Sequence, residues 1–62
     1  MDLPGILNRL AEIDHDVTRL EKEHALAQAR ADHDELLRLE TEIARLKKVT
    51  ADLREEFKRL HP

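Results

Sequence analysis

The sequence predicts an all-α protein, an antiparallel helical hairpin with arms at about residues 3–30 and 33–60 that dimerises into a four-helix bundle. Composition is one observation behind this prediction, because 40% of the 62 residues are charged, there is one aromatic residue and there is no cysteine. Such a mixture is typical of long helices and coiled coils rather than of a globular core. The other observation is a three-and-four alternation of apolar residues in each half. We therefore expect residues 1–62 to form one hairpin unit with a turn near residues 30–33.

The first predicted helix begins after Asp2, whose side chain can cap it, and Pro4 falls in the first turn, where a missing N–H costs little. The residues of its seam recur with heptad spacing. They are Leu3, Ile6, Leu10, Ile13, Val17, Leu20, His24, Ala27 and Ala31. All except His24 are apolar, so this row predicts one side of a coiled-coil seam.

The second predicted helix has its own series with the same alternation. Its members are Leu36, Leu39, Ile43, Leu46, Thr50, Leu53, Phe57 and Leu60. The first series, continued, would place the next seam residue at Arg38 instead of Leu36, and the step from Ala31 to Leu36 is five residues. Insertions of three or four residues are the usual irregularities of a continuous coiled coil. The mismatch therefore favours a reversal of the chain over one unbroken helix in a parallel dimer, which is the alternative.

Pairing the two series in opposite directions gives eight layers in which the residue numbers share one sum, 63, from Leu3 with Leu60 to Ala27 with Leu36. The centre of this symmetry lies between Ala31 and Asp32. Residues 28–35 then separate the members of the last layer, which is enough chain for a turn. The charges beside the seam support this pairing in part. Asp14 with Lys47, Arg9 with Glu56 and Arg30 with Glu35 are opposite in sign, whereas Glu21 with Glu40 and Glu23 with Glu42 are alike.

The turn contains neither glycine nor proline, and we expect Asp32 to take their place. Aspartate is enriched both in the left-handed conformation that ends many helices and at helix N-caps. Asp32 with Glu35 has the spacing of a capping box, and Asp34 and Glu35 would lie at the positive end of the second helix. This acidic tip, formed by Asp32, Asp34 and Glu35, also resembles in outline the acidic-tipped coiled-coil fingers that some transcription factors insert into the RNA polymerase secondary channel.

An isolated hairpin leaves most of each helix in water, so a chain of this length is marginally stable without a partner. Small residues form a second row beside the seam on both helices and predict the dimer face. This candidate face consists of Leu7, Ala11, Thr18, Ala25, Leu37, Ala44 and Ala51. The alternative is that alanine is simply a good helix former on a solvated surface.

The hairpin layout and the acidic turn resemble the Rop type of helical-hairpin homodimer. The segments IDHDVTRLE, residues 13–21, and LKKVTADLREEF, residues 46–57, are similar to the two helix signatures of the small bacterial YdcH-like family, whose function is unknown. The resemblance implies a hairpin and transfers no functional residue.

Histidines raise the question of a metal or a pH-responsive site. The tripeptide Asp-His-Asp occurs at residues 14–16 and 32–34, but consecutive residues of a helix point about 100° apart and cannot converge on one ion. We therefore assign no metal ligands. His24 lies among apolar seam residues, where a polar side chain fixes register and orientation, with Thr50 as its companion. A pH-sensitive or metal-binding His24 is the alternative.

A basic stripe on the second helix raises the question of nucleic acid. It consists of Arg38, Arg45, Lys48 and Arg59. A nucleic-acid-binding regulator would use these side chains on phosphates. Asp52 and Glu55 interrupt the stripe, the net charge is −3, and no aromatic row is available to stack on bases. We therefore expect a solvated face and no nucleic-acid partner.

The function we expect is that of a non-enzymatic scaffold or adaptor, whose partners are a second copy of the chain and an unidentified protein. No catalytic or cofactor-binding residues are predicted, because there is no cysteine, tyrosine or serine and too little core to enclose a pocket. The first 14 residues lack the basic and apolar regions of a signal peptide, and no apolar run is long enough to cross a bilayer. We expect a cytoplasmic protein with no membrane partner and no cofactor.

Overall fold

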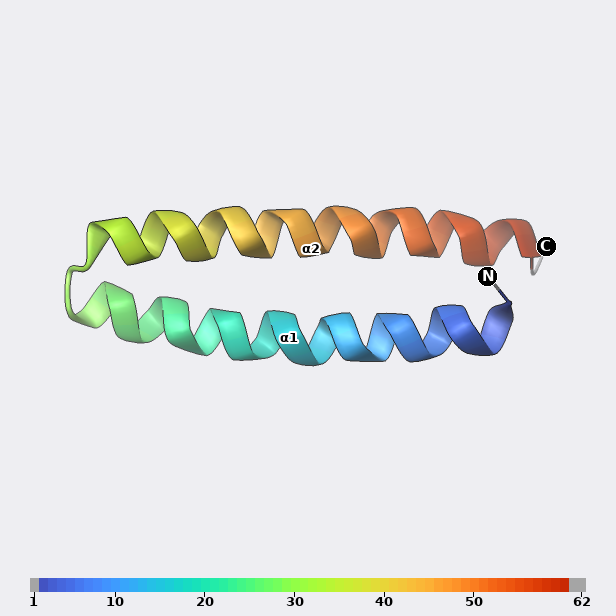
Figure 1. Ribbon diagram of the computed structural model, residues 1–62, viewed down its shortest axis with the longest axis horizontal. Coiled ribbons are helices and arrows are strands. Elements are labelled where there is room, and N and C mark those ends of the chain that lie inside the picture. The colour runs from blue at the N-terminus through green and yellow to red at the C-terminus, as the bar shows by residue number, and fades with distance from the viewer. Residues whose placement is uncertain (1, 61–62) are drawn as a thin grey trace.

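Two antiparallel helices make up the whole of the described structure, a computed structural model that covers residues 2–60 (Figure 1). Helix α1 spans Leu3–Ala29 and helix α2 spans His33–Leu60. They lie side by side in a rod of 45 × 15 × 14 Å, and the start of α1 and the end of α2 lie together at the open end, opposite the turn (Figure 1). The predicted hairpin is confirmed, and a single continuous helix is excluded. Residues 1, 61 and 62 of the predicted unit lie outside the described residues.

The start of α1 is capped as its sequence predicts. The backbone N–H of Gly5 donates to Asp2 Oδ1 at 2.8 Å, and the N–H of Ile6 donates to the Asp2 carbonyl at 3.0 Å. Pro4 lies in the first turn, where its missing N–H leaves no gap in the helical hydrogen bonds. The cap gives α1 a fixed starting point beside the end of α2.

The turn ends α1 with two returning hydrogen bonds. The N–H of Ala31 donates to the Gln28 carbonyl at 3.1 Å, and that of Asp32 donates to the Ala27 carbonyl at 3.0 Å. This is the Schellman arrangement, in which the residue after the helix adopts a left-handed conformation. Ala31 holds that conformation with φ 55°. Three residues, 30–32, are therefore enough to reverse the chain.

Asp32 begins α2 as its N-cap, as predicted, since the Glu35 N–H donates to Asp32 Oδ1 at 3.3 Å. The expectation that aspartate also supplies the left-handed residue is wrong, because Ala31 fills that position. Ala31 closes α1 and the next residue, Asp32, caps α2, so the two roles fall on two adjacent residues. The capping box is half formed, since the Glu35 carboxylate accepts from Arg38 and the Asp32 N–H donates to Ala27.

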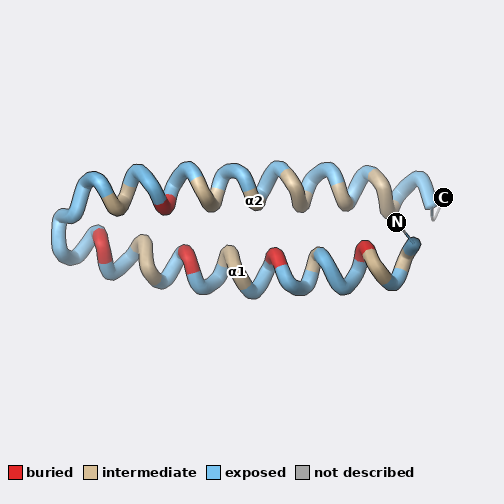
Figure 2. Tube along the Cα trace, in the orientation of Figure 1, coloured by how far each residue is buried: buried red, intermediate tan, exposed pale blue. Residues whose placement is uncertain are grey.

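The core follows the predicted seam. The buried positions of the trace lie on the facing sides of the two helices (Figure 2). The buried residues are Ile6, Ile13, Leu20, Ala27 and Leu39. Leu36, Ile43 and Leu46 pack against the part of this core nearest the turn. Every residue of the eight predicted layers is buried or half-buried except Leu60, which is 45% exposed. Leu60 is the last residue of α2 and lies at the end of the seam.

Candidate interaction surfaces

One side of the hairpin carries a row of small and apolar residues that nothing covers. We call it the alanine face, and it consists of the predicted residues Leu7, Ala11, Thr18, Ala25, Leu37, Ala44 and Ala51, all exposed. Two of them are large, Leu7 at 53% and Leu37 at 66% exposure. Both helices contribute to the face. Its members on each helix are mostly four or seven residues apart, so they lie on one side of that helix.

A shallow groove runs between the helices on this side. Its lining includes Ala44 and Ala51 of the alanine face and five charged side chains: Asp14, Glu21, Glu40, Lys47 and Arg54. The portion nearer the turn includes Glu40, and the portion nearer the open end of the hairpin includes Arg54. Glu21 and Lys47 line both portions, so the groove is continuous along the hairpin. The alanine face therefore lies beside a groove that is lined by charged side chains.

His24 reaches this groove from the seam. Its side chain is 24% exposed, and Nε2 lies 3.2 Å from Oε1 of Glu40 on α2. Within residues 2–60 this contact joins the two helices, while the other pairs of basic and acidic side chains within 4 Å lie inside one helix. Thr50, its predicted companion in the seam, satisfies its hydroxyl by donating to the Leu46 carbonyl at 3.1 Å. His24 therefore makes a directed contact with one residue of α2, and its role in fixing register stays a prediction.

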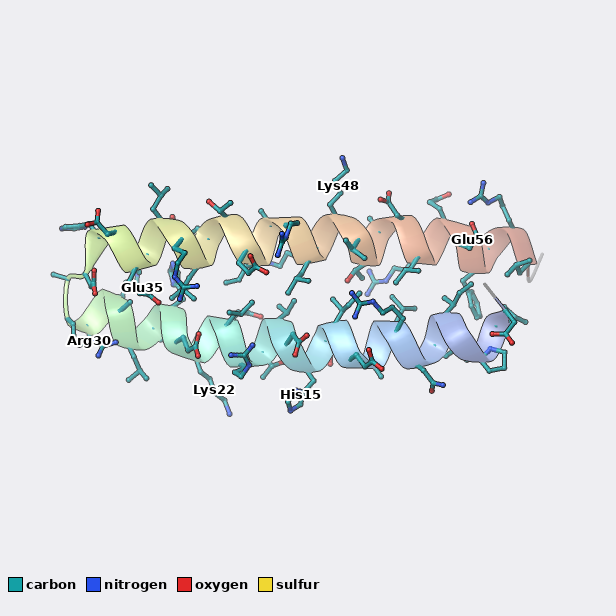
Figure 3. All side chains as sticks on the ribbon, viewed as in Figure 1. His15, Lys22, Arg30, Glu35, Lys48 and Glu56 are labelled. Carbon is teal, nitrogen blue, oxygen red and sulfur yellow. The ribbon has the colours of Figure 1, made fainter. Side chains whose placement is uncertain are left out.

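The Asp-His-Asp tripeptides do not gather metal ligands. His15 is 84% exposed, projects from α1 away from α2 (Figure 3), and lies 4.0 Å from Asp16. Within the described range 2–60, no group of three histidine, aspartate or glutamate side chains is arranged to hold a metal ion. His24 with Glu40 gives one histidine and one carboxylate, which is fewer than a structural zinc site uses.

The basic stripe is largely neutralised by its own helix. Three of its residues bind the glutamate three positions earlier, giving the ion pairs Glu35–Arg38, Glu42–Arg45 and Glu56–Arg59. The fourth, Lys48, extends from α2 away from α1 (Figure 3). A hydrogen bond from Arg38 lowers the pKa of Glu35, and the same bond raises the pKa of Arg38. The stripe is thus a row of local pairs, which weakens its attraction for phosphates.

The sequence contains a signal for these pairs that the expected charge pattern overlooked. The motif Glu-x-x-Arg-Leu recurs with heptad spacing at residues 35–39, 42–46 and 56–60. Two of the three pairs expected across the helices are replaced by local ones: Arg9 bonds Glu12 at 3.4 Å instead of Glu56, and Glu35 bonds Arg38 instead of Arg30. The third, Asp14 with Lys47, is not among the pairs within 4 Å in residues 2–60. Side chains three residues apart on one helix are always within reach, whereas a cross-helix pair must span the seam.

The acidic tip has structural roles at the turn. Asp32 caps α2, Glu35 holds Arg38, and Asp34 is exposed in the first turn of α2, where a negative charge suits the helix dipole. Two of the three carboxylates are therefore engaged within the hairpin.

Comparison of the chain with protein-family models, with curated proteins and with solved structures found no match. The resemblance to the YdcH-like family stays a prediction. Neither α1 nor α2, as described over residues 2–60, has the long uncharged apolar stretch that would cross a membrane.

Proposed function

We propose that this chain is a small, non-enzymatic scaffold or adaptor that acts through protein–protein contacts and through its own association into a four-helix bundle. The observation that supports this proposal is the uncovered alanine face, with Leu7 and Leu37 more than half exposed. Exposed leucines are ordinary when they are scattered singly. Here the two large side chains stand at opposite ends of one row of small residues, which is the arrangement that favours close packing of another helix pair.

The small core of the hairpin is a second reason to expect association. The buried core of the described residues comprises four side chains from α1 and one from α2. A folded chain of about 60 residues without disulfides or metals is marginal on such a core. Burying a second surface in a dimer adds the apolar contact that the hairpin lacks.

The dimensions of the face suit a stable dimer. The whole side of the rod measures 45 by 15 Å between Cα atoms, so covering that side on two copies would bury up to about 1,350 Å². Specific protein–protein interfaces bury about 1,200–2,000 Å² in total. A second copy of this hairpin therefore provides sufficient contact, and the bundle offers its outer surfaces to other proteins.

Sedimentation equilibrium of the purified chain tests self-association. We expect twice the mass of the chain at micromolar concentration, and dissociation in the Ala44→Glu variant, which places a charge on the alanine face. Leu26→Glu is the matched control, because Leu26 is 62% exposed and points about 100° away from Ala25 of the alanine face. A wild-type chain that stays monomeric up to about 1 mM, a concentration at which even weak complexes of a few kcal/mol form, would overturn the proposal.

A pH-responsive hairpin is the second candidate, and the contact of His24 with Glu40 is the observation that favours it. A charge gained by a half-buried seam histidine alters the pairing of the helices. Glu21, Glu40 and Lys47 line the groove beside it and would determine the response. Melting temperatures at about pH 5.5 and about pH 7.5 should then differ more in the wild type than in His24→Gln. Equal differences would exclude this candidate.

A further inference from the structure

The charged residues in the groove on the alanine face are sorted by sign along the hairpin. Glu40, Lys47 and Arg54 follow one another at intervals of seven residues on α2, so they lie in one line from the turn toward the open end. Glu21 lies near Glu40 in the turn-side half of the groove, and Asp14 lies near Lys47 at its middle. The turn-side half is therefore acidic, the middle is neutral and the open-end half is basic.

We propose that a second copy of the chain docks on the alanine face in the opposite direction, with the turn of each hairpin over the open end of the other. This inference rests on the proposed self-association and specifies its geometry. A two-fold axis that passes across the face at Lys47 brings Arg54 of one copy over Glu40 of the second copy, because both residues are one heptad, about 10 Å, from Lys47. Glu21 of the second copy lies beside the same arginine.

The apolar residues fit the same arrangement. With the axis at Lys47, Ala44 of one copy lies within about one residue, or 1.5 Å along the helix, of Ala51 of the second copy. Leu7 reaches the level of Ala25 of the second copy, a small residue that leaves room for a leucine. The exposed leucine near the open end and the small residues near the turn thereby cover each other.

A dimer with both turns at the same end has the opposite electrostatics. It would bring Glu21 and Glu40 of both copies to one level, so that four carboxylates face one another, and it would set Arg54 against its own equivalent. Like charges brought together at an interface are unfavourable and suppress that arrangement. Charge complementarity therefore selects the opposite direction.

Nitroxide labels test the direction without changing the face. Ala29→Cys places a label on an exposed residue at the turn end of α1, outside the alanine face. In the proposed dimer the two labels are each 13 residues from the axis, which predicts a separation of about 40 Å by pulsed electron resonance. Labels within about 25 Å would overturn the proposed direction and leave self-association standing. A monomeric chain would overturn both.

Charge reversal gives a second test. Arg54→Glu should weaken the dimer about tenfold at low salt, because two attractive contacts become repulsive. Lys48→Glu makes the same change of charge on the outward side of α2 and should leave the dissociation constant within about twofold. The double variant Glu40→Arg with Arg54→Glu should restore the dimer, with helix content checked by circular dichroism. A double variant as weak as Arg54→Glu alone would overturn the pairing.

Discussion

Replacing Ala31 by glycine should stabilise the hairpin, because Ala31 holds the left-handed conformation that closes α1, with φ 55°. For a residue with a Cβ this conformation costs about 1–2 kcal/mol, and glycine adopts it without that cost. Glycine also has more freedom in the unfolded chain, which offsets about 0.4–1 kcal/mol of the gain. The free energy of unfolding should therefore rise by about 0.5–1 kcal/mol, or roughly 2–8 °C in melting temperature for a chain of this size.

Thermal and urea unfolding followed by circular dichroism measure this effect. The protein concentration must be held equal between variants, since association makes the melting temperature concentration-dependent. Ala29→Gly is the matched control, because Ala29 is exposed and is the last helical residue of α1. It should lose about 0.5–1 kcal/mol, as glycine does within helices. If Ala31→Gly loses stability as Ala29→Gly does, the assignment of the left-handed closing residue is refuted.

Three further variants probe the seam and the local ion pairs. His24→Leu should raise the free energy of unfolding by about 1 kcal/mol and loosen oligomer specificity, because it replaces a polar seam residue by an apolar one. Melting curves measure the stability and sedimentation measures the oligomeric state. A loss of stability would count against the register role. Ile13→Ala should lose about 2–4 kcal/mol in urea unfolding, since Ile13 is 1% exposed, and an unchanged urea midpoint would contradict its place in the core. The hydrogen bond from Arg38 lowers the pKa of Glu35 below 4.5, so its stabilisation is present above pH 4.5 and is lost as pH falls through the lowered value. Urea midpoints at about pH 3 and about pH 6 should differ less in Glu35→Gln than in the wild type, and an identical difference would exclude this contribution.

The heptad arithmetic predicts the fold because burial is set by positions that repeat along the whole chain. Ile6, Ile13 and Leu39 recur at seam spacing, and they are the largest fully buried side chains. A reversal that keeps them facing one another has one centre, between Ala31 and Asp32, and the structure turns there. Many seam residues support that register, so the predicted hairpin does not depend on the identity of any one residue.

Finer features depend on competition between local partners, which a pattern of charges does not resolve. Arg9 could pair with Glu12 on its own helix or with Glu56 across the seam, and in the structure it pairs with Glu12. The hydrogen bonds that return to Ala27 and Gln28 place the left-handed conformation at position 31, and in this sequence that position is an alanine. His24 is the seam residue whose polar partner the sequence left open, since several carboxylates lie within one turn of Leu39, and Glu40 is the one that it contacts.

The order of the local glutamate–arginine pairs and the charges at the helix ends make the two helices unequal before they meet. In the three pairs of α2 the glutamate precedes the arginine, and α2 has acidic residues in its first turn and basic residues in its last. In the two pairs of α1 the arginine precedes the glutamate, and α1 has neither kind of terminal charge. A peptide of residues 33–60 should therefore be partly helical on its own, and a peptide of residues 3–29 less so. During folding, α2 would then form early as a template, and α1 would become ordered along it from the turn outward.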